Sequence, residues 1–289
     1  MFAVIADSTS DIPVAKLQEM GVSIVPLSIN FGEDVYIDGL ELGPEEFYEK
    51  LDAFRPDLPK SACPAPGKFE AAYRKAAEGD IDGIVCITLT GASSGTYNSS
   101  VVAAQAAEDL NIPIRCVDSK STAAVMSMMI EKACKMREAG ASADECADHL
   151  EKIVEVAEIY VAMESIEYIL KGGKIAEGGE GADSGLAMKP ILTLRQSDGA
   201  VNVLSKPRGQ KAQYREMANF AKEFVAKHPQ AEIRFCQANS LDHIDALKKL
   251  LDKEGISYSE AQPGWLCSLI GVYFGNHSYA ICMVPKELL

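Results

Sequence analysis

The sequence predicts an α/β protein with an N-terminal doubly wound parallel-sheet lobe and a C-terminal α+β lobe. The chain has 289 residues, which is long enough for two lobes, and its hydrophobic content of 47% is that of an ordinary globular protein. Up to about residue 157, apolar runs alternate with helix-like segments, as they do in βαβ units. After that point the pattern changes to short strands that suit antiparallel pairing. We therefore expect lobes at residues 1–157 and 158–289.

The first half alternates strands and helices along the chain. Apolar runs closed by turn residues predict strands at residues 2–6, 22–30, 33–38, 83–89 and 114–117. Apolar residues at helical spacing predict helices at residues 12–20, 44–54, 68–78, 98–110, 123–139 and 143–156. Residues 55–66 contain too many prolines for a strand or a helix and predict a rigid loop. The run at 83–89 is continuously apolar, which is typical of the middle strand of a parallel sheet.

The second half predicts a smaller mixed arrangement. Strands are expected at residues 160–162, 189–194, 200–204, 232–238, 266–273 and 279–284. Helices are expected at residues 166–170, 213–227 and 243–255. Asp198 and Gly199 predict the turn of an antiparallel pair, and residues 171–185 are rich in glycine and predict a lid-like loop.

Composition excludes several classes of function. A formal net charge of −14 argues against nucleic acid and against an anionic membrane surface, because both bind clustered Lys and Arg. The N-terminus has no basic region followed by an apolar one, and no apolar stretch has the length of a membrane span, so we expect a soluble cytoplasmic protein. The eight cysteines show no C-x-x-C pair, and the expectation is reduced, buried thiols with no metal and no cofactor.

Polar turns follow several of the predicted parallel strands. They occupy residues 7–11, 61–66, 90–96 and 118–121, and all are rich in Ser, Thr or Asp. Ligands of doubly wound sheets bind at this edge. In the turn at 90–96, Ser93 or Ser94 could simply cap the following helix. Alternatively, the hydroxyls and the free N–H groups of Gly95 and Thr96 could bind an anion without any basic residue.

The same turn also matches the G-x-S-x-G nucleophile elbow of serine hydrolases. Gly91, Ser93 and Gly95 fit the pattern, and the strand–turn–helix context is right. A hydrolase of that fold needs more sheet before the nucleophile, and then an acid and a histidine after it. Of the four histidines only His277 lies in a predicted loop, and no acidic residue is near it in sequence. An esterase-like serine hydrolase that uses Ser93 remains the alternative hypothesis.

Two further segments could contribute polar groups. The proline-dense loop could fix the hydroxyl of Ser61 in place, although such a loop can be purely structural. The stretch around Lys174, with Gly172 and Gly173, could cradle a phosphate. It lacks the full spacing of a phosphate-binding loop, so a solvated loop is the default interpretation.

Taken together, these segments resemble the DegV family of bacterial lipid-binding proteins over essentially the whole chain. The matching pieces are 7–11 (DSTSD), 36–39 (YIDG), 94–97 (SGTY), 118–119 (DS), 170–175 (LKGGKI) and 189–192 (KPIL). The resemblance implies a two-lobed protein that holds one long-chain fatty acid in a buried tunnel between its lobes. Some members of the family present that acid to a fatty acid kinase, which phosphorylates the carboxylate for phospholipid synthesis. It thus implies a carrier with no catalytic residues.

The resemblance also implies which residues bind the ligand. The family's carboxylate ligands, a Thr in a T-S-Q-P loop and the Ser of an S-G-T turn, correspond here to Ser61 and Ser94. Ala62 and Cys63 replace the usual Ser-Gln pair. Lys174 stands where the family usually has the arginine of G-G-R, and Tyr273 stands where it usually has a histidine. The predicted ligand-binding residues are Ser61, Ser94, Gly95, Thr96, Tyr273 and Lys174, with Arg208 a less secure match.

Overall fold

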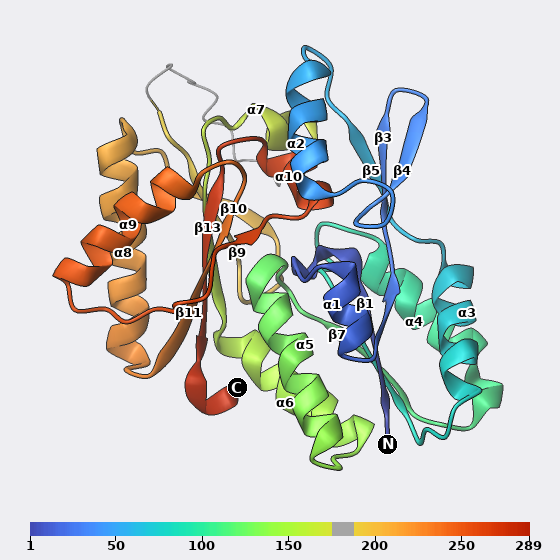
Figure 1. Ribbon diagram of the computed structural model, residues 1–289. Helices are drawn as coiled ribbons and strands as arrows, with labels where there is room; N and C mark the ends of the chain where they lie inside the picture. Colours follow the sequence, from blue (N-terminus) through green and yellow to red (C-terminus); the bar gives the residue numbers. More distant parts are fainter. Residues whose placement is uncertain (175–187) are drawn as a thin grey trace.

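The computed structural model describes residues 1–174 and 188–289. Within them the chain forms a parallel sheet, a larger mixed sheet and a small antiparallel sheet, with helices between and around them (Figure 1). Of the glycine-rich segment predicted at residues 171–185, the part from residue 175 onward lies outside the described residues.

The parallel sheet belongs to the first half of the chain and has the strand order β2-β1-β6-β7. Its strands are β1 (Ala3–Asp7), β2 (Val22–Val25), β6 (Ile84–Thr88) and β7 (Ile114–Asp118). The helices of this part are α1 (Val14–Glu19), α3 (Pro66–Ala77), α4 (Thr96–Ala106), α5 (Ala123–Glu138) and α6 (Ala143–Val156). Alternate residues of β1 and β6 pack against α3 and α4 on one face and against α5 and α6 on the other. The doubly wound arrangement is the predicted one, and β6 is buried along its whole length.

The mixed sheet has the strand order β10-β9-β8-β13-β11-β12. Its strands are β8 (Glu158–Ala162), β9 (Ile191–Leu194), β10 (Val201–Ser205), β11 (Ala231–Gln237), β12 (Gly264–Trp265) and β13 (Tyr279–Pro285). Helices α8 (Gln210–Lys227) and α9 (Leu241–Lys253) cover one face. The other face packs on α5 and α6, which therefore lie between the two large sheets (Figure 1). One continuous apolar core includes residues of both sheets and of these two helices.

The small sheet has the order β4-β3-β5 and lies above the carboxyl edge of the parallel sheet (Figure 1). It consists of β3 (Ser28–Phe31), β4 (Asp34–Ile37) and β5 (Lys60–Ala62). Helices α2 (Pro44–Ala53) and α10 (Ser268–Phe274) pack beside it, and α7 (Glu167–Lys171) contacts α10. Short 3₁₀ turns η1 (Ser8–Ser10), η2 (Glu108–Leu110) and η3 (Lys286–Leu288) complete the chain.

Several predicted elements are wrong in type or extent. The single strand expected at residues 22–30 is two strands in different sheets, because Pro26 interrupts the hydrogen-bonding ladder. The loop expected at residues 55–66 contains β5, which pairs with β3. The strand expected at residues 266–273 is mostly the helix α10. That run is mainly apolar and its residues 268–272 are all buried, so its pattern has no period that separates a strand from a short buried helix.

The cysteine expectation also needs one correction. Cys86, Cys116, Cys236 and Cys282 lie in strands. Cys63, however, is exposed. It follows β5 in the proline-dense loop, where the neighbouring backbone turns toward solvent.

Candidate functional site

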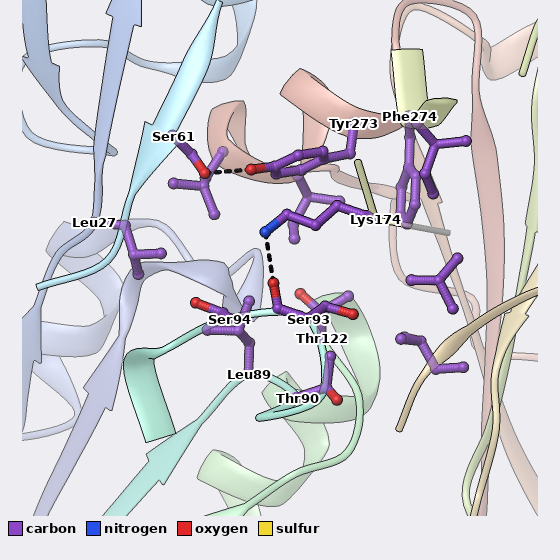
Figure 2. A pocket seen from close by; sticks show the side chains of 15 residues that line it. Leu27, Ser61, Leu89, Thr90, Ser93, Ser94, Thr122, Lys174, Tyr273 and Phe274 are labelled. Atoms are coloured by element: carbon purple, nitrogen blue, oxygen red, sulfur yellow. Dashed lines mark hydrogen bonds between the residues drawn. The ribbon is translucent and has the colours of Figure 1, made fainter. Parts of the chain in front are cut away.

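A pocket lies beyond the carboxyl end of β6, where the three sheets approach one another (Figure 2). It encloses about 520 Å³ of space between atoms, part of it open to solvent. Its polar lining consists of Ser61, Thr90, Ser93, Ser94, Thr122, Lys174 and Tyr273. Its apolar lining consists of Leu27, Leu89, Ile169, Leu194, Val201, Leu269, Ile270 and Phe274. The pocket thus combines a polar group of side chains with a predominantly apolar wall.

The turn between β6 and α4 supplies part of the polar side. The Oγ of Ser94 lies 2.8 Å from Oγ1 of Thr96 and accepts a hydrogen bond from the N–H of Thr96 at 3.3 Å. Thr96 is the first residue of α4 and Gly95 is its N-cap. Ser94 precedes the N-cap, and its hydroxyl accepts from the first helical N–H while also lining the pocket. An anion beside Ser94 would meet the positive end of the α4 dipole.

The carboxylate of Asp118 holds the start of this turn through hydrogen bonds to the backbone. It accepts hydrogen bonds from the N–H groups of Gly91 at 3.1 Å and of Lys120 at 2.9 Å. Burial raises the pKa of Asp118, and these two hydrogen bonds oppose that rise. A Cβ on Gly91 would lie 2.9 Å from Oδ2 of Asp118, so this position requires glycine.

Ser61 and Tyr273 meet from opposite ends of the sequence. The Oγ of Ser61 lies 2.5 Å from Oη of Tyr273, and Figure 2 shows the two side chains pointing at one another. Ser61 lies in β5, where it pairs with Ile29 of β3, and Tyr273 lies in α10. The contact between α10 and β5 therefore fixes both hydroxyls at one side of the pocket.

Lys174 places an ammonium group inside the pocket. Its Nζ donates a hydrogen bond to the carbonyl oxygen of Ser93 at 2.7 Å and lies 5.1 Å from the ring centroid of Tyr273 (Figure 2). The turn at residues 90–96 could by itself bind an anion without a basic residue. In the structure a cation is present, and it adds Coulomb attraction for a negatively charged group.

The remaining predicted residues lie around this group. Gly95 is exposed and does not line the pocket, and a Cβ there would lie 3.2 Å from Sγ of Cys63. Thr96 is fully buried behind Ser94. Arg208 forms an isolated β-bridge with Met188 and is not part of the pocket lining. Ser61, Ser94, Lys174 and Tyr273 are the predicted residues that the pocket brings together.

Sequence reasoning did not find the apolar wall. Leu194 and Val201 are register partners across the β9–β10 hairpin, and Phe274 comes from the end of α10. Each looks in the sequence like an ordinary core residue, and only the tertiary fold brings them to one surface. Thr90 was seen only as part of a turn, whereas its hydroxyl donates to the carbonyl oxygen of Gly199 at 2.8 Å and ties the hairpin to the parallel sheet.

The geometry around Ser93 lacks the parts of a hydrolase. All four histidines are within the described residues, and none of them lines the pocket. His277, the candidate base, hydrogen-bonds through Nδ1 to the carbonyl oxygen of Asn239. Ser93 does not have a positive φ, and α4 begins only three residues later, at Thr96. Within the described residues, no histidine is therefore in place to take the proton of the Ser93 hydroxyl.

The described part of the chain comprises residues 1–174 and 188–289. These residues contain no group of three or more His, Cys, Asp or Glu side chains placed to hold a metal ion. None of their helices has both the length and the apolar character needed to cross a bilayer.

Comparison with known proteins gives consistent matches along the chain. The model of the DegV family of uncharacterised proteins matches residues 1–286. DegV domain-containing protein SCO2569 of Streptomyces coelicolor is 31% identical over 206 residues, which is 71% of each chain. DegV domain-containing protein TTE1491 of Caldanaerobacter subterraneus is 27% identical over 252 residues, 87% of this chain and 88% of the relative.

Solved structures agree with this match. A fatty acid-binding DegV family protein from Thermus thermophilus has a TM-score of 0.88 at 25% identity, over 98% of this chain and 99% of that one. A stearic acid-binding protein from Eubacterium ventriosum has a TM-score of 0.89 at 23% identity over the full length of both chains, and this likeness shows the fold alone. The predicted α/β fold, with a parallel sheet and a separate mixed sheet, is confirmed.

Proposed function

The chain belongs to the DegV family, and from this premise we propose that it binds one long-chain fatty acid in the pocket beyond β6 and acts as a carrier, not as an enzyme. The observation that carries the proposal is the convergence of Ser61, Ser94, Lys174 and Tyr273. They come from four separate segments and lie together in a pocket whose other lining is mainly apolar. The related protein from Thermus thermophilus binds fatty acid, which supports the same ligand class here.

The carboxylate end is satisfied by hydrogen bonds and by one positive charge. The hydroxyls of Ser61 and Ser94 donate to the two carboxylate oxygens, and the start of α4 adds its dipole. The ammonium group of Lys174 neutralises the charge of the carboxylate. The hydroxyl of Tyr273 is within reach of the same carboxylate oxygens because it already contacts Ser61. A buried carboxylate with these partners avoids the penalty of an unpaired charge.

The acyl chain supplies most of the affinity. Burying about fourteen methylenes is worth roughly 11 kcal/mol at ~0.8 kcal/mol per CH₂. Lost freedom of the ligand and of the protein offsets several kcal/mol of this gain. The apolar wall formed by α10, the β9–β10 hairpin and Leu89 is the surface against which the first part of the chain packs. We propose that the tail continues between the lobe of residues 1–157 and that of residues 158–289.

Delivery to an enzyme completes the proposal. A carrier that exposes the carboxylate and buries the tail suits a kinase that phosphorylates the head, which is the role that the resemblance to the family implies. The setting would be the cytoplasm. Lys174 and Tyr273 stand where the family usually has Arg and His, so they are the positions at which a kinase would meet a different surface here.

The protein purified from a bacterial host tests the ligand. Native mass spectrometry should show a bound mass that lipid extraction identifies as a long-chain fatty acid. Replacing both Ser61 and Ser94 by Ala should weaken retention about a hundredfold or more, since each lost hydrogen bond to a charged group costs about 1.5–3 kcal/mol. Ser257→Ala, at an exposed position near α9, is the matched control. Protein that carries no extractable lipid and takes up none when mixed with oleic acid would contradict the proposal.

A separate assay tests whether the protein has hydrolase activity that depends on Ser93. Wild-type protein and Ser93→Ala are compared for turnover of a p-nitrophenyl ester. The carrier proposal expects no turnover that depends on Ser93. Ester cleavage that disappears in Ser93→Ala would overturn it.

A further inference from the structure

The helix α10 carries much of the pocket and is too short to hold itself in place. It spans Ser268–Phe274, and Leu269, Ile270, Tyr273 and Phe274 all line the pocket. A helix of seven residues is unstable alone, so its position depends on packing and on the groups that satisfy its ends.

The N–H groups at the start of α10 are satisfied by two distant carboxylates. Oδ1 of Asp11 accepts a hydrogen bond from the N–H of Cys267 at 2.8 Å. Oδ1 of Asp38 accepts one from the N–H of Leu269 at 3.3 Å. The side chain of Cys267, the N-cap residue, makes no capping hydrogen bond. Two acids from the first forty residues therefore take the place of a local cap for α10, which lies more than two hundred residues later in the chain.

Asp38 is buried, Asp11 is partly buried, and each has a carboxylate oxygen that the cap does not use. Asp38 is only 1% exposed. The Oδ2 atoms of Asp11 and of Asp38 are both buried and have no hydrogen-bond partner. Since an unsatisfied buried oxygen costs free energy, a purely structural cap is better made by a serine or an asparagine.

The groups that face the two acids supply no compensating charge. Asp11 faces the thiols of Cys236 and Cys267 and the carboxylate of Asp38. Asp38 faces Asp7 and the hydroxyls of Ser8 and Ser268. Tyr48 of α2 is also close to both acids, and its Oη donates to the carbonyl oxygen of Leu266 at 3.1 Å. Arg234 lines a neighbouring cavity that Asp11 also lines, but its guanidinium is held by Glu131 at 2.8 Å.

From this arrangement we infer that Asp11 and Asp38 are positioning residues of the ligand pocket, which hold the first turn of α10 and thereby keep Tyr273 against Ser61. The inference rests on the proposed function, because it concerns how well that pocket holds its ligand. The two acids do not touch the ligand and act only through α10.

The positioning depends on protonation in the physiological range. Burial raises the pKa of Asp11 and of Asp38 to about 7, so one or both are protonated below neutrality. Above pH 7 both ionise, and two buried negative charges without a cation repel each other. Both acids line one cavity together with Cys267 and Ser268 at the start of α10. The repulsion is relieved when that start of the helix moves away from the acids, and Tyr273 then leaves Ser61. Ligand affinity should therefore fall as the pH rises through 7.

The experiment measures the dissociation constant of a dansyl-labelled fatty acid at several pH values from 6 to 8. The full-length wild type is compared with Asp11→Asn, Asp38→Asn and Tyr273→Phe. Asparagine keeps an oxygen that can accept the N–H of Cys267 or Leu269 but cannot ionise. Asp242→Asn, which replaces an exposed acid of α9, is the matched control, and Asp38→Ala removes the acceptor altogether.

The expected result is a pH profile that depends on these residues. Wild type and Asp242→Asn should bind about fivefold more weakly at pH 8 than at pH 6, since one linked proton changes affinity by at most about tenfold per pH unit. Asp38→Asn and Asp11→Asn should lose most of this slope, and so should Tyr273→Phe, because the acids act through that side chain. Asp38→Ala should bind more weakly at every pH.

The failures can be told apart. A wild-type profile that is flat, or a slope that persists unchanged in Asp38→Asn or in Tyr273→Phe, overturns the positioning role while leaving fatty acid binding intact. Absence of binding at every pH in the wild type overturns the proposed function and this inference with it. Because all variants are titrated with the same labelled ligand, ionisation of the fatty acid itself cancels in the comparison.

Discussion

Replacing Gly172 by alanine should displace Tyr273 without straining the backbone. Gly172 follows α7 with φ −75° and ψ −8°, a conformation that alanine adopts freely. A Cβ at this position would lie 2.6 Å from Cδ1 and 2.8 Å from Cε1 of Tyr273. Carbon atoms in ordinary contact are at least about 3.5 Å apart, so the ring must withdraw by roughly 1 Å. Such a shift breaks the contact between Tyr273 and Ser61.

The cost can be estimated from these contacts. Overpacking costs about 1–3 kcal/mol, and the lost hydrogen bond costs about 1 kcal/mol. The smaller entropy of the unfolded chain returns about 0.4–1 kcal/mol. Together they leave a net destabilisation of about 2 kcal/mol, which lowers the melting temperature by roughly 3 °C in a chain of this size. Affinity for the fatty acid should fall about tenfold, because Tyr273 no longer reaches the carboxylate.

Circular dichroism melts and fatty acid titrations measure the two effects. Gly67→Ala is the control, since a Cβ there meets nothing within 4 Å in the first turn of α3, and it should stabilise the protein slightly. In a Tyr273→Ala background the cost of Gly172→Ala should disappear, because the ring that causes it is absent. Equal stability and affinity of Gly172→Ala and wild type, or a cost that remains in the Tyr273→Ala background, would refute the reasoning.

Three further changes probe other parts of the molecule. The pKa of Asp11 and of Asp38 is raised from 3.8 to about 7, so the native state holds protons that the unfolded chain releases. The stability that these protonated acids contribute is complete below about pH 4 and is lost as the pH rises through 7. Calorimetry should accordingly show Asp38→Asn raising the melting temperature more at pH 8 than at pH 6, and an equal shift at both would contradict this. Gly199→Ala, with φ +74° and a Cβ 2.2 Å from Oγ1 of Thr90, should cost about 2 kcal/mol and speed proteolysis of the β9–β10 hairpin. Ser142→Ala removes a capping box on α6 and should lower the unfolding free energy in urea by about 1 kcal/mol, whereas a loss near zero would show that the cap is dispensable.

Local patterns were sufficient for the elements whose burial is regular. The run that became β6 is apolar throughout, and α5 and α6 have the spacing and the boundaries expected of helices. Local patterns did not predict α10, because every side of residues 268–272 is buried and the acids that satisfy the first turn of this helix come from the other end of the chain. They also failed at β5, whose three residues become a strand only by pairing with β3.

The site divides in the same way. Ser94 could be proposed from its place after a buried strand and before a helix. Ser61 and Lys174 could be noted in their own loops, but their role beside Tyr273 in one site followed only from the likeness to a family, because nothing in their own neighbourhoods indicates that they meet. The apolar wall had no signal at all, since Leu194 and Val201 resemble any other half-buried strand pair.

The placement of α5 and α6 between the two large sheets limits how a fatty acid can be exchanged. Both sheets bury their inner faces against this one helical layer, and a single core runs through all of it. A rigid-body opening of the two halves would expose that core to water. The free energy required is far above the few kcal/mol typical of the conformational changes that accompany ligand exchange. For the proposed carrier we therefore expect loading and release through a small displacement of α7 and α10, which line the pocket, with the rest of the molecule remaining closed.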